Sequence, residues 1–286
     1  MSTRCGGRWR VARKDGSSDP PPPTINQTIL GLSTPTPFTV WRDFTATNGR
    51  PPYRRSFDTG APTWAGHTAH NDDVAAPTGT GALKSLASFK PVVADVLSGS
   101  LDSYFNQLAI DAKDGTYFMF WHEPENNLTQ ADYKAIYNRI LPIMKAADAS
   151  HKYITCLTIG AFEGGKDGTT WFPTGAGAPD FISVDVYNGY SPTNGRPWKE
   201  LQARVESTFL AQVVPTGIPY GITEFGTRAD PGNVNRRATW LTNAWTFLKS
   251  SNFKFACYWS ENDYALDGDS QTLAAWTTIV NDPDNI

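Results

Sequence analysis

Short apolar runs with the composition of β-strands recur along most of this chain, and stretches with helical spacing separate several of them. The eight runs lie near residues 28–32, 53–57, 84–89, 116–121, 153–159, 181–186, 219–224 and 254–259. The second is the weakest of them, because its residues are mostly polar. Strands that alternate with helices pair in parallel. Eight such units in about 260 residues match the size of a closed barrel. We therefore predict an α/β fold, a (β/α)8 TIM barrel, over residues 28–286.

The helical stretches carry apolar residues three and four positions apart. In the clearest one, Thr129 and Asp132 resemble a capping box and precede the apolar stripe. Pro142 is expected to kink this helix near its end. Other helical stretches run near residues 101–113, 198–212, 233–249 and 270–280.

An open, doubly wound sheet is the alternative architecture for such a chain. Sheets of that kind usually bind a ligand at the first turn between strand and helix. Here that turn reads Gly31-Leu-Ser-Thr-Pro35, which lacks the glycine-rich phosphate-binding pattern. The sequence therefore favours the barrel.

Composition narrows the classes of function. The chain has 286 residues, of which 40% are hydrophobic and 19% are charged, as in an ordinary globular protein. No apolar run approaches the roughly 18 residues typical of a membrane span. The net charge is −3, and removing the basic start at residues 1–14 leaves 20 basic against 28 acidic residues. An acidic body argues against nucleic acid as a partner, and we predict neither a nucleic-acid nor a membrane partner.

Residues 1–27 are predicted to form a short, extended N-terminal arm. They are basic at the start and end in the polyproline-like spacer Pro20–Pro23. No apolar stretch follows the basic residues, so we expect no signal peptide. These features suit an arm that docks on a protein partner, for example in a virion or another larger assembly.

The sequence lacks the motifs that would indicate other catalytic classes. The three cysteines, Cys5, Cys156 and Cys257, are not spaced as a disulfide framework or a zinc site. The sequence has no Gly-x-Ser-x-Gly elbow, His-Glu-x-x-His or Walker motif. We therefore predict neither a metal nor a cofactor.

Two glutamates follow strand-like runs at equivalent positions. Glu123 lies in Tyr117-Phe-Met-Phe-Trp-His-Glu-Pro124, and Glu224 lies in Pro219-Tyr-Gly-Ile-Thr-Glu-Phe-Gly226. At the carboxyl ends of the fourth and seventh strands, both would face one cleft at the mouth of a barrel. Pro124 is expected to hold Glu123 in an extended conformation, and Gly226 to permit a sharp exit from its strand. Either acid alone could instead be a rim carboxylate paired with a basic residue.

These motifs resemble those of a known group of enzymes. His122-Glu123-Pro124 and Thr223-Glu224-Phe225-Gly226 are similar to the motifs of the retaining glycoside hydrolases of clan A. The histidine before the first glutamate resembles family 26, which includes β-mannanases. The resemblance implies that Glu123 is the acid/base, that Glu224 is the nucleophile, and that the hydroxyl of Tyr187 holds Glu224. Retaining enzymes place the two carboxyl groups about 5–5.5 Å apart, and we expect that spacing here.

Other residues are candidates for binding the sugar. Trp259 ends the eighth strand, where an indole can form an apolar floor for a sugar ring. His122 could hydrogen-bond to sugar, and Trp64 and His70 lie in a long loop expected over the barrel mouth. Asp185 could pair with a buried cation or contribute to catalysis.

The sequence therefore predicts a retaining β-glycoside hydrolase. Its expected substrate is a polysaccharide, mannan-like or another cell-surface or cell-wall glycan, which it cuts by endo action. The alternative is a non-catalytic carbohydrate-binding barrel that serves as a subunit of a larger assembly such as a phage tail.

Overall fold

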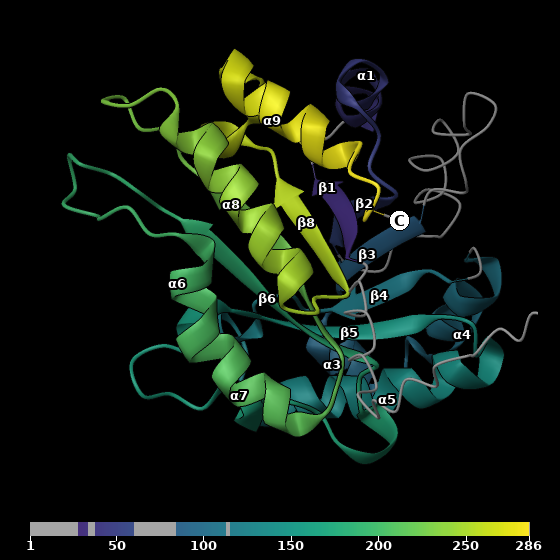
Figure 1. Ribbon diagram of the computed structural model, residues 1–286. Coiled ribbons are helices and arrows are strands. Elements are labelled where there is room, and N and C mark those ends of the chain that lie inside the picture. The colour runs from purple at the N-terminus through teal and green to yellow at the C-terminus, as the bar shows by residue number, and fades with distance from the viewer. Residues whose placement is uncertain (1–27, 34–37, 60–83, 113–114, 286) are drawn as a thin grey trace, which may run out of the picture.

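A closed parallel barrel forms the centre of the molecule (Figure 1). The computed structural model describes residues 28–33, 38–59, 84–112 and 115–285. Eight strands pair in chain order and β1 pairs with β8, which confirms the predicted fold class. The strands are β1 (Ile29–Ser33), β2 (Tyr53–Thr59), β3 (Lys84–Lys90), β4 (Tyr117–Phe120), β5 (Lys152–Thr158), β6 (Phe181–Asn188), β7 (Tyr220–Thr227) and β8 (Phe255–Trp259).

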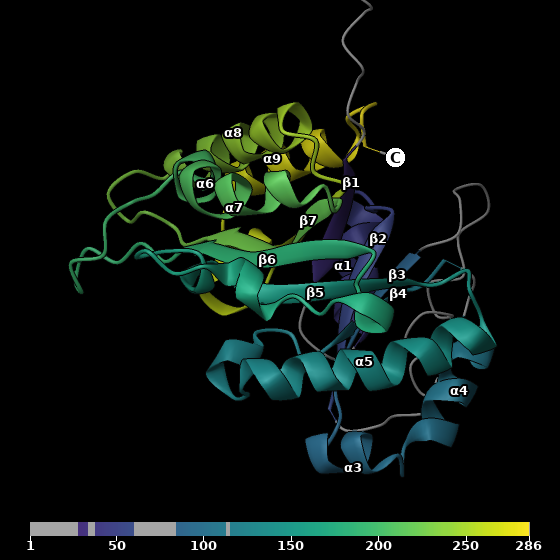
Figure 2. The ribbon, with the colours of Figure 1, turned by 90° about the horizontal axis from the view of Figure 1, so that it is seen from below.

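Helices cover the outside of the barrel, with α3 to α5 on one side and α6 to α9 on the other (Figure 2). Their bounds are α1 (Phe38–Asn48), α3 (Val93–Ser98), α4 (Asp102–Asp111), α5 (Gln130–Ala147), α6 (Leu201–Val205), α7 (Ala211–Val213), α8 (Arg236–Ser250) and α9 (Ser270–Val280). A π-helical turn, Glu206–Leu210, joins α6 to α7. All five predicted helical stretches are present.

Helix α5 begins where the sequence predicts it. The Thr129 side chain accepts a hydrogen bond from the backbone N–H of Asp132 and caps the helix. Pro142 lies inside the helix, which continues beyond it to Ala147. The apolar stripe of this helix, which includes Tyr133 and Ile140, is fully buried against the strands.

Aromatic rings close the lower part of the barrel interior. Tyr117, Phe181 and Phe255, near the amino ends of β4, β6 and β8, lie 5.4–6.0 Å apart between ring centroids. Small and apolar side chains, such as those of Met119 and Cys257, pack in the same cluster. Because this plug is apolar, the charged interior residues gather toward the carboxyl ends of the strands.

The N-terminal arm predicted at residues 1–27 lies outside the described residues. Among the residues that are described, none of the helices is both long and apolar enough to cross a bilayer.

The barrel interior is packed tightly enough to require glycine at one position of β1. A Cβ on Gly31 would lie 2.2 Å from the Cys257 Sγ of the neighbouring strand. We expect Gly31→Ala to lower the free energy of unfolding by about 1–3 kcal/mol, the usual cost of overpacking, in denaturant titrations. Gly160→Ala is the control, because its Cβ would have no neighbour closer than 3.4 Å. Adding Cys257→Ala should recover part of the loss, and equal stability of the two alanine variants would contradict this packing.

Candidate active site

Glu123 lies on a sharp turn just past β4. Trp121 and Glu123 both adopt left-handed backbone conformations, with φ of 55° and 52°. The expected extended conformation before Pro124 is therefore wrong, and Pro124 instead begins a short 3-10 helix, Pro124–Asn126. The turn is held because the Glu123 N–H donates to the Cys156 carbonyl at 3.0 Å. Such strained backbone persists only where the surrounding structure enforces it.

A register shift aims the second glutamate into the barrel. Val184 pairs with Ile222 and Asp185 pairs with Glu224, so Thr223 is an extra residue in β7. In a regular strand, neighbouring side chains point to opposite faces, and a bulge re-aims them. Here Thr223 donates to Asp185 Oδ1 at 2.6 Å, and Glu224 also faces the interior. The bulge therefore places both side chains in the same polar cluster.

A buried arginine pairs with this cluster. Arg55 of β2 is 1% exposed, and its Nη2 lies 2.8 Å from Glu224 Oε1 and 3.9 Å from Asp185 Oδ2. Its guanidinium also lies 4.5 Å from the centre of the Phe57 ring. Burial opposes the charge, but Glu224 and Asp185 together raise the pKa of Arg55 above its ordinary value. Arg55 is thus a fixed cation beneath the barrel mouth.

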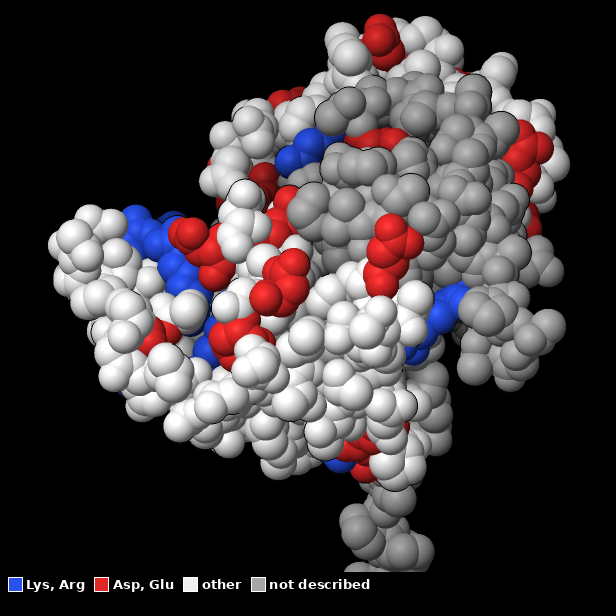
Figure 3. Space-filling view, turned by 90° about the horizontal axis from the view of Figure 1, so that it is seen from above, with Lys and Arg blue, Asp and Glu red and all other residues white. Residues whose placement is uncertain are grey.

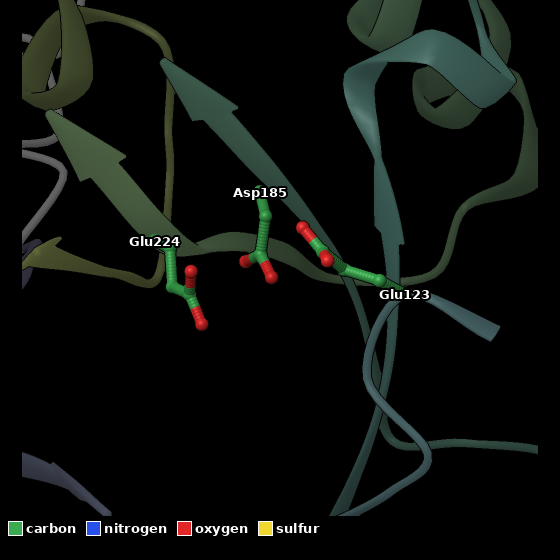
Figure 4. Close-up of side chains that lie close together, drawn as sticks. All are labelled: Glu123, Asp185 and Glu224. Atoms are coloured by element: carbon green, nitrogen blue, oxygen red, sulfur yellow. The ribbon is translucent and has the colours of Figure 1, made fainter. Parts of the chain in front are cut away.

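Three carboxyl groups lie close together at one place in the barrel (Figure 4). Glu123, Asp185 and Glu224 come from β4, β6 and β7, and one oxygen of each lies within 4.8 Å of the others. Asp185 is 2% and Glu224 is 6% exposed. The distant sequence motifs are therefore brought to one place at the carboxyl ends of the strands.

This crowding changes proton affinity at Glu123. Burial is the larger cause that raises the pKa of Glu123, and the negative charges of Glu224 and Glu125 raise it further. Lys90 and Arg55 oppose the shift. For Asp185, burial and then the Glu224 charge raise the pKa well above the ordinary value. The cluster therefore favours a protonated carboxyl group beside an ionised one.

Oxygen clusters of this kind can also hold a metal ion. In this cluster Glu224 accepts hydrogen bonds from Arg55 and from the Tyr187 hydroxyl, so both of its oxygens are engaged. Arg55 already supplies positive charge, and a second cation nearby would be repelled. The donor set therefore fits proton transfer better than metal binding.

Tyr187 lies where the sequence places it. Its hydroxyl donates to Glu224 Oε2, so it holds the carboxylate from the side opposite Arg55. Gly226 does not form the expected sharp exit, because it lies within β7. A Cβ there would come within 3.1–3.4 Å of Tyr264, Trp259 and Tyr187. Glycine is used at this position for close packing around Tyr187.

The rings of His122 and Trp259 both pack against the ring of Phe57. Both rings contact Phe57 edge-on, at 5.2 Å and 5.3 Å between centroids. Burial, followed by the charges of Arg55 and Lys90, lowers the pKa of His122 to about 2, so the ring is neutral. Its Nδ1 is hydrogen-bonded to Ser88 Oγ at 2.7 Å. Phe57 in turn contacts the Arg55 guanidinium, and the roles of the two rings in sugar binding remain predictions.

Two predicted residues cannot be placed. Trp64 and His70 lie outside the described residues, in the gap between β2 and β3.

Sequence reasoning missed Arg55, the central cation. The strand that carries Arg55 is only weakly predicted, because its residues, Tyr53-Arg-Arg-Ser-Phe57, are mostly polar. A polar run in a predicted barrel strand was the available signal, since interior charges must have partners. Tyr264 was also missed, and its ring lies 5.0 Å from that of Tyr187.

The charged surface is mixed. On the face seen in Figure 3, the described Lys and Arg side chains are interspersed with Asp and Glu instead of forming one broad basic area. Among the described residues, ion pairs such as Arg228 with Asp263 join opposite charges.

Solved structures share this fold over most of the chain. The endo-beta-1,4-mannanase double mutant of Cellulomonas fimi has a TM-score of 0.60 and 16% identity, over 91% of this chain and 72% of the mannanase. GH26C from Muricauda sp. MAR_2010_75 has a TM-score of 0.61 and 16% identity, over 92% and 87% of the two chains. Thermotoga maritima Cel5A, a mutant form in complex with cellobiose, has a TM-score of 0.58 and 13% identity, over 88% and 97%.

No protein-family model matches the sequence, and no curated protein matches it. The structural matches confirm the predicted resemblance to clan A glycoside hydrolases, family 26 among them, at the level of the fold.

The buried ion pair predicts a large effect of removing Arg55. Arg55→Met should lower the free energy of unfolding by about 3–5 kcal/mol, because it leaves buried carboxylates without their cation. Denaturant titration measures this loss. The control is Arg139→Met, which removes a solvent-exposed pair with Asp102 and should change stability little. Equal stability of the two variants would show that the carboxylates do not depend on Arg55.

Proposed function

We propose that this protein is a retaining glycoside hydrolase that cuts β-linked polysaccharide, with Glu123 as acid/base and Glu224 as nucleophile. The observation that carries the proposal is the proximity of the two carboxyl groups, whose nearest oxygens lie within 4.8 Å. Retaining enzymes separate the two groups by about 5–5.5 Å, whereas inverting enzymes separate them by about 6.5–9.5 Å to admit a water. The short separation supports retention.

In the first step, Glu224 attacks the anomeric carbon and Glu123 gives its proton to the departing glycosidic oxygen. The raised pKa of Glu123 supports the role of donor, because the group keeps its proton closer to neutral pH. Arg55 and Tyr187 both donate hydrogen bonds to Glu224, which fixes the direction of its carboxylate. The product of this step is a glycosyl ester on Glu224.

In the second step, Glu123 is ionised and removes a proton from water. The water oxygen attacks the anomeric carbon, the bond to Glu224 breaks, and the configuration of the starting sugar is restored. Acid, nucleophile and water complete the reaction.

We propose a mannan-like or related β-glycan as the substrate, with endo action. The fold is similar to that of an endo-beta-1,4-mannanase and of a protein solved with cellobiose, which supports this substrate class. Trp259 is proposed to lie beneath a sugar ring and His122 to hydrogen-bond to it. Both rings pack on Phe57, whose ring also contacts the Arg55 guanidinium of the cluster, which supports these roles.

The assigned roles predict different responses to the leaving group. Glu224→Ala should show no turnover of mannan or of a dinitrophenyl β-glycoside, because no glycosyl ester can form. Glu123→Ala should lower kcat on mannan by about 10²–10⁴-fold and should affect the dinitrophenyl substrate less, since that leaving group needs no proton. Glu163→Gln is the control, because Glu163 pairs with Arg204 outside the cluster. NMR of the first product should detect the β-anomer, and an α-anomer would exclude retention.

The rival proposal, a carbohydrate-binding barrel in a larger assembly, has a separate outcome. It requires that mannan, xylan, mixed-linkage glucan and bacterial wall glycans bind without turnover. Deleting residues 1–24 should leave hydrolysis of soluble substrate unchanged if the N-terminal arm serves only to dock a partner. A loss of activity after this deletion would contradict the proposed arm.

Lys90 and Glu125 have opposite effects on the pKa of Glu123, so removing each charge should shift the pH profile of kcat/KM in opposite directions. The kcat/KM should fall as pH rises through the pKa of Glu123, which lies above the ordinary value of about 4.3, because Glu123 then loses its proton. Lys90 lowers this pKa and Glu125 raises it. Lys90→Met should therefore move the alkaline limb to higher pH, and Glu125→Gln should move it to lower pH. Lys145→Met, on the outer helix α5, is the control, and shifts of the same sign in both variants would contradict the assignment of Glu123.

A further inference from the structure

The loop after β8 places a tyrosine ring against Tyr187. The ring of Tyr264 lies 5.0 Å from that of Tyr187 between centroids, and the two ring planes are tilted by 50°. Among the described residues, it is the one aromatic ring that contacts Tyr187. Gly226 of β7 lies against both rings, because a Cβ there would be 3.1 Å from Tyr264 and 3.4 Å from Tyr187. The absence of a side chain at Gly226 therefore leaves room for this contact.

Buried side chains fix the backbone of Tyr264. Arg237 of α8 is 3% exposed, and its Nη2 donates to the Tyr264 carbonyl. The buried hydroxyl of Tyr258 donates to the same carbonyl at 3.1 Å. Two residues further along, the backbone N–H of Leu266 donates to Ser260 Oγ at 3.0 Å and closes the loop. A shift of this loop would break contacts of two buried polar side chains, which costs free energy.

The ring of Tyr264 is held as well. The guanidinium carbon of Arg228 lies 5.7 Å from its centroid, a cation–π contact. Arg228 directly follows β7 and also pairs with Asp263 of the same loop, at 3.1 Å. Backbone and ring are therefore both fixed, so Tyr264 presents a rigid surface to Tyr187.

Tyr187 needs such a surface because its hydroxyl must stay on one carboxylate oxygen. That hydroxyl donates to Glu224 Oε2, while Arg55 Nη2 donates to Oε1 at 2.8 Å. A tyrosine ring can turn about its side-chain bonds, and a turn about the first of them moves the hydroxyl farther than any other atom. The contact with Tyr264 restricts this turn, since the two rings already touch.

We propose that Tyr264 is a positioning residue for the reaction: its ring holds Tyr187, whose hydroxyl in turn holds Glu224 in line with the anomeric carbon. This inference rests on the proposed glycosidase function. Displacing a reacting group by about 1 Å can lower a rate by about 10²-fold, so a residue that touches only Tyr187 can still affect the rate. Among the described residues the Tyr264 hydroxyl has no hydrogen-bond partner, so the ring is the part that acts.

A double-mutant cycle tests whether Tyr264 acts through the Tyr187 hydroxyl. The measurement is kcat/KM on a dinitrophenyl β-mannobioside or β-cellobioside, whichever the wild type cleaves, because attack by Glu224 limits this value when the leaving group needs no proton. Tyr264→Ala should lower it about tenfold, and Tyr187→Phe at least as much. Tyr264→Phe keeps the ring and should stay within about twofold of the wild type. In the Tyr187→Phe background, Tyr264→Ala should cost less than about twofold more, because the hydroxyl that it positions is gone.

Tyr220→Ala is the matched control for the loss of a half-buried tyrosine. Tyr220 lies at the amino end of β7, the opposite end of the barrel, and its hydroxyl donates to the Ser251 carbonyl at 2.7 Å. This variant should lose stability in denaturant titrations and keep its kcat/KM. If Tyr264→Ala does not fold, Tyr264→Leu replaces it in the cycle, since leucine retains bulk without the planar ring.

Three kinetic results would overturn the inference: no loss in Tyr264→Ala, an equal loss in Tyr264→Phe, or losses that multiply independently in the two backgrounds. If the wild type cleaves no glycoside, the proposed function fails by itself. Crystal structures of the wild type and Tyr264→Ala then test the positioning alone. We expect the Tyr187 hydroxyl to leave Glu224 in the variant, and an unchanged contact in both structures would overturn the role of Tyr264.

Discussion

The site depends on one buried cation. Arg55 is 1% exposed, so it can remain charged there only beside anions. Glu224 and Asp185 supply that charge at 2.8 Å and 3.9 Å. The same contact that stabilises Arg55 also fixes the position of the Glu224 carboxylate. Stability of the interior and preparation of the proposed nucleophile therefore arise from a single interaction.

Two irregular backbone segments bring the other side chains of the site to this ion pair. In a regular β7, Thr223 and Glu224 would point to opposite faces. The register shift lets Thr223 reach Asp185 and lets Glu224 reach Arg55. On the opposite wall, the left-handed conformation of Glu123 brings its carboxyl group toward the same point. Both departures from ideal geometry lie at the site, where strain is commonly stored for function.

The barrel and part of the site could be predicted from the sequence, and the physical reason differs from one residue to another. Apolar runs and helical spacing are local signals, so all eight strands could be predicted. Glu123, Glu224 and Tyr187 were found because each directly follows or ends such a run. The left-handed turn at Glu123 and the bulge at Thr223 could not be found, since contacts with neighbouring strands impose them. Arg55 was missed because its partners are more than a hundred residues away.

The two walls of the site differ in how strongly a substitution there would disturb the barrel core. The Glu224 wall is locked by Arg55, Tyr187 and Asp185, all from central strands, so substitutions there disturb the core as well as the chemistry. The Glu123 wall continues into a short 3-10 helix and a loop that is held by hydrogen bonds such as Gln130 to Thr170 and Lys166 to Gly160. We therefore expect substitutions on the side of β4 and β5 to disturb the barrel core less than substitutions on the side of β2, β6 and β7.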